Sequence, residues 1–314
     1  MVSVIVVAYN LENIVVPTLE SVARQTFTDF ELIIADDGSQ DKTVEVVTEW
    51  CKNNLDPKKN PYKIVSNPGH EKRGIAANYN RGLKVATREW LKFIDGDDLL
   101  ADDCLENNIR FVSEDPDRKV VFSKMRTFVN EVDNEDHIPQ EFPYTRHHKF
   151  FNLSAKDQYK YFLVDSFNSA PVTFLNREVV NKVGGYDGRF FIQDLPLWLK
   201  LTSNGYKIHF LPKVTAYYRV NFGVSSSQDY LFSPIFYASY KDLHETMIVP
   251  NVPFYKLSFW NKYFVFRLKY GVAHRFFNNN GTEKSRKIMK ALDYLIFSYS
   301  LNVFKGKILK VIRA

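Results

Sequence analysis

Three aspartates and a glycine, Asp95-Gly96-Asp97-Asp98, directly follow the apolar run at residues 90–94. A strand that ends in three carboxylates concentrates negative charge at the edge where α/β sheets bind ligands. Clustered carboxylates repel one another unless a cation lies among them. Mg²⁺ or Mn²⁺ chelated by a phosphate-bearing substrate meets that need, because hard ions take carboxylate and phosphate oxygens. The alternative is a solvated acidic turn in which Asp97 or Asp98 caps the next helix.

Two earlier segments also place polar side chains at expected strand ends. Tyr9-Asn10 follows one β-branched run, and an Asp-Asp-Gly-Ser turn at residues 36–39 follows another. At such an edge the Tyr9 ring could stack on a nucleobase, and a carboxylate could accept hydrogen bonds from a base imide or a ribose hydroxyl. Ordinary turns explain both segments as well, with Asn10 as a helix cap and an Asx turn at residues 36–39.

A basic pair, Lys72-Arg73, precedes the helix expected from Gly74. The helix dipole disfavours cations at this end, so the pair makes sense if an anion docks there. Arg73 could then pair with a pyrophosphate or with a strand-end aspartate. The alternative is an exposed pair without such a role.

The elements that must position these residues follow from the apolar pattern. The first hundred residues alternate strands and helices, which predicts an α/β fold with a mostly parallel sheet and helices on both faces. The expected strands are 3–8, 31–35, 63–66, 90–94, 119–126, 170–176 and 214–220. The expected helices are 13–24, 43–53, 74–86, 102–113, 154–164 and 195–204. The polar segment 130–150 is expected to be a loop.

Composition excludes several classes of protein. Hydrophobic residues make up 45% of the 314 residues, enough for a sizeable core. Two cysteines, Cys51 and Cys104, exclude a disulfide framework and a Cys-based zinc site, and they favour a reducing compartment. The first strand lacks the features of a signal peptide, and no apolar run reaches the roughly 18 residues of a membrane-spanning helix. We therefore expect a cytoplasmic protein.

The end of the chain differs from the rest. Residues 256–314 carry 13 Lys and Arg against two acidic residues, although the whole chain has a net charge of only +6. Beyond residue 229 the pattern is helical and aromatic, so we expect a catalytic domain at 1–225 and a basic helical region at 226–314. Apolar stripes at 288–296 and 304–312 among lysines are typical of helices that lie on an anionic membrane at the inner face of the cell. The alternative is that the stripes pack on the catalytic domain or on a second subunit; nucleic-acid binding is not expected, because no such module is recognisable.

Seven motifs, in order and at matching spacing, resemble those of the family 2 glycosyltransferases, an inverting group with the GT-A fold. They are Tyr9-Asn10, the turn at 36–39, Arg73-Gly74 with Asn80, Asp95-Gly96-Asp97-Asp98, Gly184-Gly185-Tyr186-Asp187, Gln193-Asp194 with Leu197-Trp198, and Tyr218-Arg219 followed by Ser225-Ser226. The resemblance covers about the first 225 residues. It implies a Rossmann-like sheet flanked by helices, and a nucleotide-sugar donor.

The resemblance also implies a role for each matching residue. Tyr9 and Asp37 would hold the nucleobase, with Asn10 beside them and Asp37 on the imide. The remaining nucleotide-sugar residues would be Arg73 near the base and diphosphate, Asp95 on the ribose, and Gly185 near the donor sugar. Asp97 would bind the metal that bridges the diphosphate, and Asp194 would be the general base.

Inverting transfer requires a general base, because a carboxylate on the acceptor side must take the proton of the attacking hydroxyl. The metal would stabilise charge on the leaving phosphate. Two departures from the family pattern stand out. Gln193 replaces the usual Glu, which removes a like charge beside Asp194 and would tend to lower its pKa. Asn221 stands where many relatives have a His, so the metal would depend on Asp97 and the diphosphate.

We therefore expect a metal-dependent transferase that moves a sugar, most simply from a UDP-sugar, to a hydroxyl of a growing glycan that is lipid-linked in many relatives. One alternative is a nucleotidyltransferase, but residues 10–16 contain no Gly, Lys or Arg to cradle phosphates. Another is an inactive nucleotide-sugar binder or membrane scaffold, against which the intact Asp97 and Asp194 argue.

Overall fold

The structure is a computed structural model, and it describes residues 1–67, 74–132, 137–167, 170–220 and 232–295. The chain divides into two compact units, Met1–Ser226 and Ser227–Ala314. Each unit is described by itself below, as the N-terminal and the C-terminal unit. The boundary expected at residue 225 lies outside the described residues.

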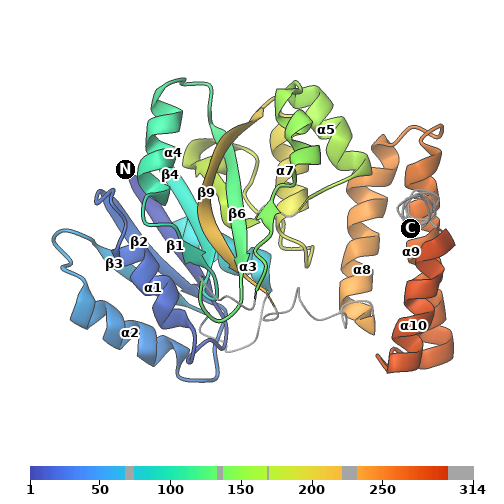
Figure 1. Ribbon diagram of the computed structural model, residues 1–314, viewed down its shortest axis with the longest axis horizontal. Helices are drawn as coiled ribbons and strands as arrows, with labels where there is room; N and C mark the ends of the chain where they lie inside the picture. The colour runs from blue at the N-terminus through green and yellow to red at the C-terminus, as the bar shows by residue number, and fades with distance from the viewer. Residues whose placement is uncertain (68–73, 133–136, 168–169, 221–231, 296–314) are drawn as a thin grey trace, which may run out of the picture. The chain divides into compact units, whose positions relative to one another are not determined.

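The N-terminal unit is built on one mixed sheet with the strand order β3-β2-β1-β4-β8-β6-β9-β5, to which β7 adds by pairing with β6 (Figure 1). Strands β1 to β4 run parallel, and so do β6 and β9, whereas β8, β5 and β7 pair antiparallel with their neighbours. The strands are β1 (Val2–Ala8), β2 (Phe30–Asp36), β3 (Tyr62–Ser66), β4 (Trp90–Asp95), β5 (Leu99–Leu100), β6 (Val120–Phe128), β7 (Glu141–Phe142), β8 (Thr173–Asn176) and β9 (Ile208–Arg219).

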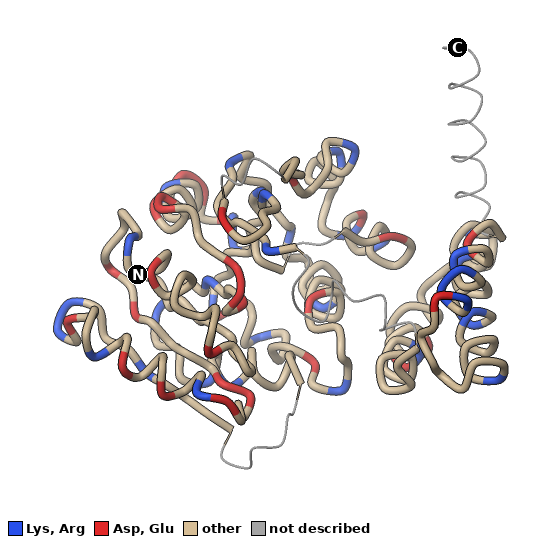
Figure 2. The backbone as a smooth tube through the Cα atoms, turned by 60° about the horizontal axis from the view of Figure 1, so that its bottom comes forward, with Lys and Arg blue, Asp and Glu red and all other residues tan. Residues whose placement is uncertain are grey.

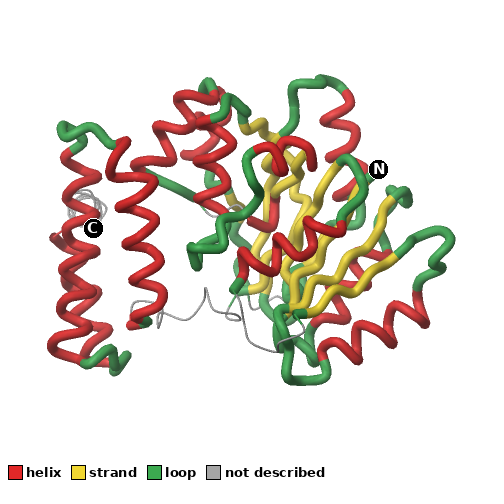
Figure 3. The backbone as a smooth tube through the Cα atoms, turned by 180° about the vertical axis from the view of Figure 1, so that it is seen from behind, coloured by secondary structure: helices red, strands yellow, loops and turns green. Residues whose placement is uncertain are grey.

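Helices flank the sheet on both sides (Figures 1 and 3). They are α1 (Val15–Ala23), α2 (Thr43–Asn54), α3 (Ile75–Val85), α4 (Cys104–Ser113), α5 (Ala155–Val164), α6 (Arg177–Lys182) and α7 (Asp194–Ser203). The predicted α/β architecture is thus confirmed. Strands β1 and β2 are buried along their whole length, which is why they appear in the sequence as continuous β-branched and apolar runs.

Strand register brings the polar strand ends to one edge. Ala8, the last residue of β1, pairs with Asp36 at the end of β2, and Val7 pairs with Asp95 at the end of β4. Because these strands are parallel, the loops that follow them leave the sheet on the same side. The segments carrying Tyr9, Asp37 and Asp97 therefore start from neighbouring points.

Two expectations from the sequence were wrong in detail, and one helix was missed. The expected loop at 130–150 contains β7 and most of a 3₁₀ helix at Thr145–Asn152, in which Phe150 and Phe151 are buried. Strand β9 begins at Ile208 and not at residue 214. Its pairing with β6 continues through a register shift near Lys124, and this shift interrupts the alternation of buried and exposed side chains by which a strand is recognised in a sequence. Helix α6 was not expected, since a six-residue helix is too short to show a period.

The C-terminal unit is helical. Its elements are α8 (Pro234–Leu243), a π-helical turn at His244–Ile248, a 3₁₀ turn at Val249–Asn251, α9 (Leu257–Phe277), α10 (Glu283–Leu292) and a 3₁₀ turn at Asp293–Leu295. Within the described residues, no helix is both long enough and apolar enough to cross a membrane.

Helix α10 packs against α9, and this contact uses part of the stripe expected at residues 288–296. Met289 and Ala273 are buried together with Phe232, and Leu292 packs beside them. An ion pair of 2.8 Å between Lys269 and Asp293 closes the end of the contact. Part of the stripe expected at 288–296 therefore packs inside the C-terminal unit. The stripe expected at 304–312 lies outside the described residues.

Candidate active site

The acidic turn after β4 is fixed tightly against β1 and α1. The Gly96 N–H donates to the carbonyl of Val7 at 2.8 Å, and a Cβ at Gly96 would lie only 2.7 Å from the side chain of Leu11. The Thr18 hydroxyl donates to the carbonyls of Gly96 and Asp98 at 2.9 and 2.7 Å. A larger residue at Gly96 would have to displace the Leu11 side chain and would crowd the Val7 carbonyl at 3.2 Å, and these contacts hold the turn in place.

Burial and crowding keep these carboxyl groups from ionising easily. Burial, followed by the charge of Asp97, raises the pKa of Asp95 to about 7, and a hydrogen bond from Tyr79 opposes the rise. Burial and the charges of Asp97 and Asp95 raise the pKa of Asp98 well above its usual range. Burial also raises the pKa of Asp97, against the effect of Arg219. The site therefore favours an added cation.

Neither Asp97 nor Asp98 caps the helix that follows, so that alternative is wrong. Helix α4 begins after Asp103, beyond the two-residue strand β5. Asp98 instead accepts a hydrogen bond from the backbone N–H of Arg219 at 2.8 Å through Oδ1. Its other oxygen, Oδ2, is buried and has no hydrogen-bond partner among the described residues.

Arg219, at the end of β9, is a cation beside this turn. Its Nε donates to the carbonyl of Asp97 at 2.8 Å, and its guanidinium lies 4.4 Å from the ring centre of Phe128. Sequence reasoning included Arg219 only as part of a family motif and gave it no role at the acidic turn. The available signal was a basic residue at the end of a predicted strand.

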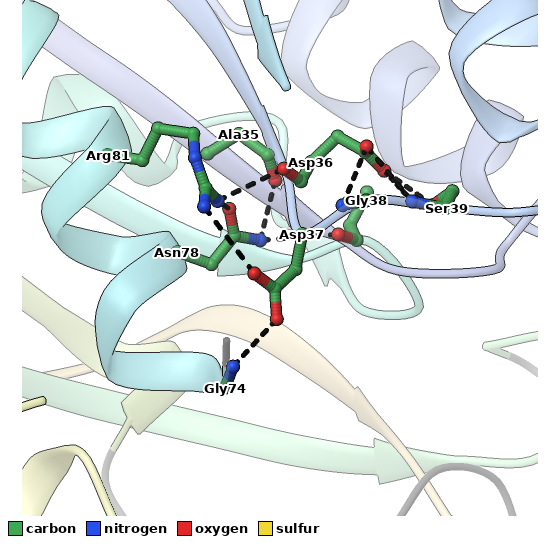
Figure 4. A network of polar contacts seen from close by, with 9 residues as sticks. Ala35, Asp36, Asp37, Gly38, Ser39, Gly74, Asn78 and Arg81 are labelled. Atoms are coloured by element: carbon green, nitrogen blue, oxygen red, sulfur yellow. Dashed lines mark hydrogen bonds and ion pairs between the residues drawn. The ribbon is translucent and has the colours of Figure 1, made fainter. Parts of the chain in front are cut away.

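Asp36, the last residue of β2, and Asp37, which follows it, make different contacts (Figure 4). The carboxylate of Asp36 turns back on its own loop and accepts from the N–H groups of Gly38 and Ser39, at 3.0 and 3.1 Å, so the Asx-turn interpretation holds for this residue. Asp37 points the other way and accepts from the N–H of Gly74 at 2.8 Å. Its other oxygen lies 3.5 Å from Arg81 Nη2. Asp37 thus joins the β2 edge to the start of α3.

The loops after β1 and β2 are tied together by Asn10. Its side-chain oxygen accepts from the N–H of Gln40 at 2.9 Å, and its own N–H donates to the hydroxyl of Ser39. Helix α1 follows Ile14 without a side-chain cap, so the expectation that Asn10 caps it was wrong. Tyr9 is half-buried at the end of β1, next to these contacts. The expected donor residue Arg73 lies outside the described residues.

Asn80 connects two motifs that are far apart in the chain, its own and the Gly-Gly-Tyr-Asp turn at residues 184–187. Its side-chain amide donates to the carbonyl of Tyr186 at 2.7 Å and accepts from the Tyr186 N–H at 3.0 Å. Gly185 beside it has φ of 64°, and a Cβ there would lie 2.8 Å from the Asn80 oxygen. The Gly-Gly-Tyr-Asp turn is therefore clamped to α3.

Asp194 is the first residue of α7, and it accepts from the N–H of Leu195 at 2.7 Å. Burial raises its pKa, against hydrogen bonds from the backbone N–H groups of Leu195 and Asp194 itself. Asp187 differs, because hydrogen bonds from Arg189, with a further contribution from Lys200, lower its pKa. Of these two carboxyl groups, Asp194 is the better suited to accept a proton near neutral pH.

An aromatic cluster connects Asp194 to the acidic turn. Tyr79 stacks on Phe93 with ring centres 4.8 Å apart, and Tyr186 meets these rings edge-on at 4.8 and 5.3 Å. The charges of Asp194 and Asp95 both add to the effect of burial in raising the pKa of Tyr186. Asp194 also contributes to the raised pKa of Asp95, so the structure brings these two predicted residues within electrostatic reach of each other.

Several known proteins are similar to this chain in sequence. The sequence model of Glycosyl transferase family 2 matches residues 3–184. The UDP-Glc:alpha-D-GlcNAc-diphosphoundecaprenol beta-1,3-glucosyltransferase WfaP of Escherichia coli is 26% identical over 233 residues, which cover 73% of this chain and 81% of that protein. The putative glycosyltransferase EpsH of Bacillus subtilis is 34% identical over 116 residues, which cover 37% of this chain but 31% of that protein.

Solved structures share the fold. S. aureus TarS 1–349 in complex with UDP-GlcNAc superimposes with a TM-score of 0.60 at 20% identity, covering 94% of this chain and 81% of that one. The mannosyltransferase PcManGT from Pyrobaculum calidifontis, in complex with GDP-Man and Mn²⁺, gives a TM-score of 0.52 at 20% identity, with coverage of 94% and 69%. Because the family match spans more than half of the chain, this protein belongs to the family 2 glycosyltransferases and is a transferase with the GT-A fold.

Proposed function

We propose that the protein transfers a sugar, with inversion, from a UDP-sugar to a hydroxyl of a glycan acceptor. The observation that carries this proposal is the pairing of a half-buried carboxyl of raised pKa, Asp194, with the acidic turn at Asp95 and Asp97 across one aromatic cluster. The choice of UDP has support from the name of the E. coli relative and from the nucleotide bound to TarS.

The donor would lie along the strand ends. Tyr9 and Asp37 would hold the uracil, with Asn10 fixing the loop between them. Gly74 N–H and Arg81 contact the two oxygens of Asp37, and a carboxylate of this kind can accept hydrogen bonds from several donors. Arg73 would pair with the diphosphate, Asp95 would bind the ribose, and Gly185 would border the donor sugar.

A divalent cation, Mn²⁺ or Mg²⁺, would bind at Asp97. The residues fit such an ion, because three carboxyl groups are crowded there and one buried oxygen of Asp98 has no hydrogen-bond partner among the described residues. The described residues contain no group of three or more His, Cys, Asp and Glu side chains that could hold a metal alone. The remaining ligands would therefore be diphosphate oxygens. When bound, the ion would stabilise the charge of the leaving diphosphate.

Asp194 would act as the general base. It would take the proton of the acceptor hydroxyl while that oxygen bonds to the anomeric carbon on the face opposite the breaking bond to the diphosphate, which inverts the configuration. A carboxylate works best in this role when its pKa lies near the working pH, and the burial of Asp194 moves its pKa in that direction.

The acceptor would be a lipid-linked glycan, and the C-terminal unit would hold the enzyme at the inner face of the cell membrane. Phe254, Tyr255 and Leu257 are exposed by 85%, 64% and 70%, next to Lys256. Basic residues outnumber acidic ones by nine to two between residues 256 and 295 (Figure 2). Exposed aromatic side chains with basic neighbours suit an anionic lipid surface. The acceptor named for the E. coli relative, a diphosphoundecaprenol lipid, supports the same choice.

Nucleotide-sugar binding and turnover together test the catalytic proposal. UDP-glucose, UDP-GlcNAc and GDP-mannose should be compared for thermal stabilisation with and without Mn²⁺, since a ligand of the native state raises the apparent stability. We expect a UDP-sugar to stabilise most, to need Mn²⁺, and to release UDP when a glycan-lipid acceptor is added. Binding without UDP release would favour the inactive binder, and release of pyrophosphate from UTP and a sugar phosphate would favour the nucleotidyltransferase.

Vesicle sedimentation tests the membrane surface. The protein should sediment with vesicles of anionic phospholipid and less as salt rises, because charge attraction is screened beyond about 8–10 Å at physiological ionic strength. Changing Phe254, Tyr255 and Leu257 to Ser should release it, while the matched change of the exposed Ile138 to Ser should not. Equal sedimentation of both variants, or none by the wild type, would overturn the assignment of this surface.

A further inference from the structure

We propose that Arg81, held in place by Asn78, is a positioning residue that fixes the carboxylate of Asp37 and thereby sets which nucleobase the enzyme accepts. The inference rests on the proposed function, in which Asp37 binds the imide of uracil. The contacts that carry it join the helix α3 to the ends of β1 and β2, and Figure 4 shows them from close by.

The start of α3 presents three residues to the edge of the sheet. Gly74 is the N-cap, Asn78 follows it by four positions and Arg81 by three more, so the three lie on one face of the helix. The N–H of Gly74 donates to Asp37 Oδ2 at 2.8 Å, and Arg81 Nη2 lies 3.5 Å from Asp37 Oδ1. One helix therefore holds the carboxylate at both of its oxygens.

The guanidinium of Arg81 is itself anchored next to Asp37. Its Nη1 donates to the carbonyl of Asp36 at 3.0 Å and to the side-chain oxygen of Asn78. A guanidinium is planar and rigid, so a fixed Nη1 also fixes Nη2 beside the carboxylate of Asp37. Lysine has a single terminal nitrogen and could not occupy both positions.

Asn78 connects this arginine to the two strand ends. Its side-chain nitrogen donates to the carbonyls of Ala35 and Ala8, at 2.8 and 3.2 Å, and its oxygen accepts from Arg81. The residue is only 1% exposed, and these contacts use both N–H donors of the amide. The network thus ties together the ends of β1 and β2, which lead to the two residues expected to hold the base.

The direction of the Asp37 carboxylate matters for the choice of base. A carboxylate accepts hydrogen bonds and donates none, so it suits the N3–H of uracil and opposes N3 of cytosine, which is itself an acceptor. Without Arg81 the carboxylate would lose the contact that fixes Oδ1 and could turn away from the base. Uracil would then bind less tightly, and the difference between the two bases would shrink.

Binding of UDP and CDP tests this role. Both nucleotides should be titrated by calorimetry in the presence of Mn²⁺, and we expect the wild type to prefer UDP. Arg81→Met keeps an extended side chain and removes the guanidinium. It should weaken UDP binding by roughly 10- to 100-fold, the range for one contact with a charged group, and lower the preference for UDP over CDP by a similar factor. An unchanged preference would overturn the proposal.

Two further variants separate positioning from damage to the fold. Arg24→Met is the matched control, because Arg24 also lies 3.5 Å from an aspartate, Asp102, but both side chains are more than half exposed. Its UDP affinity and preference should stay within about twofold of the wild type. Arg81→Lys keeps the charge without the planar guanidinium, so it should bind UDP better than Arg81→Met and less well than the wild type.

Two readouts do not respond to a merely structural loss. Partial unfolding of Arg81→Met would weaken UDP and CDP by the same factor and leave their ratio unchanged. In the transfer reaction, Arg81→Met should raise KM for the UDP-sugar and leave kcat within about threefold, because contacts to the base are the same in the ground state and the transition state. A fall in kcat without a rise in KM would contradict the proposed role.

A double-mutant cycle distinguishes a failure of this inference from a failure of the proposed function. Asp37→Asn combined with Arg81→Met should bind UDP no worse than Asp37→Asn alone, because Arg81 acts through Asp37. Losses that multiply would overturn the role of Arg81 and keep UDP as a ligand. Urea unfolding of the same four proteins needs no nucleotide. If the wild type bound neither nucleotide while Asp37 and Arg81 stayed coupled in unfolding, the proposed function would be refuted and their contact would be structural only.

Discussion

Replacing Asn80 with Ala should weaken the N-terminal unit at the turn that leads to the proposed base. Asn80 makes both of its hydrogen bonds to the backbone of Tyr186, a donor contact of 2.7 Å and an acceptor contact of 3.0 Å. Alanine would leave the N–H and the carbonyl of Tyr186 without these partners, in a residue whose side chain is buried. Each such loss costs about 1–2 kcal/mol, so we expect a total of about 2–4 kcal/mol.

This loss is large enough to measure by thermal unfolding. In a domain of this size, 1 kcal/mol shifts Tm by roughly 2–4 °C, so Asn80→Ala should lower Tm by roughly 5–15 °C. The matched control is Asn53→Ala, an exposed position on α2 where alanine is the better helix former and the shift should be near zero. Activity at a temperature where Asn80→Ala stays folded should also fall, because the turn precedes Gln193 and Asp194 in the chain.

Two results would contradict this reasoning. A Tm shift of Asn80→Ala no larger than that of Asn53→Ala would mean that the clamp contributes nothing to stability. A large shift in Tm with unchanged kcat would mean that the clamp stabilises the fold but does not position the turn for catalysis. Gly185→Ala offers an independent check, since its φ of 64° and the nearby Asn80 oxygen both disfavour a Cβ.

Two further predictions concern the chemistry. Asp97→Ala should abolish transfer and make UDP binding independent of Mn²⁺ in calorimetric titrations; Mn²⁺-dependent binding that persists would contradict the metal assignment. Asp194→Asn should keep donor binding and lower kcat by roughly 100-fold or more. Burial raises the pKa of Asp194, and a base must be deprotonated, so wild-type activity should be lost as pH falls through that raised pKa. A kcat for Asp194→Asn within a few-fold of wild type would exclude it as the base.

Much of the fold could be predicted because buried parallel strands leave a plain signal. Strands β1, β2 and β4 are runs of mostly apolar residues, and the helices between them begin and end within a few residues of their predicted bounds. The predictions failed where the signal depends on a partner far away in the chain. Strand β7 has only two residues and forms by pairing with β6, where Glu141 lies opposite Arg126 and the two side chains make an ion pair of 2.9 Å.

The candidate site was predictable in its positions but not in its contacts. The motifs placed Asp37 and Asp97 at strand ends, and the parallel register brings those ends together. No pattern indicated that Asp37 would bind the N–H of Gly74, or that Arg219 would lie beside Asp97. Tyr79 was not singled out, because a tyrosine at a buried helix position has the same sequence pattern as an ordinary core residue.

Asp187 and Asp194 show why residue type alone could not decide the base. Both belong to family motifs and both are aspartates, so residue type does not distinguish them as a base. In the structure two basic side chains, Arg189 and Lys200, lower the pKa of Asp187, while burial raises that of Asp194. A carboxylate held by cations is a weak base, and a buried one gains more from taking a proton. The environment built by α7 and the clamped turn therefore favours Asp194 as the residue that takes the proton.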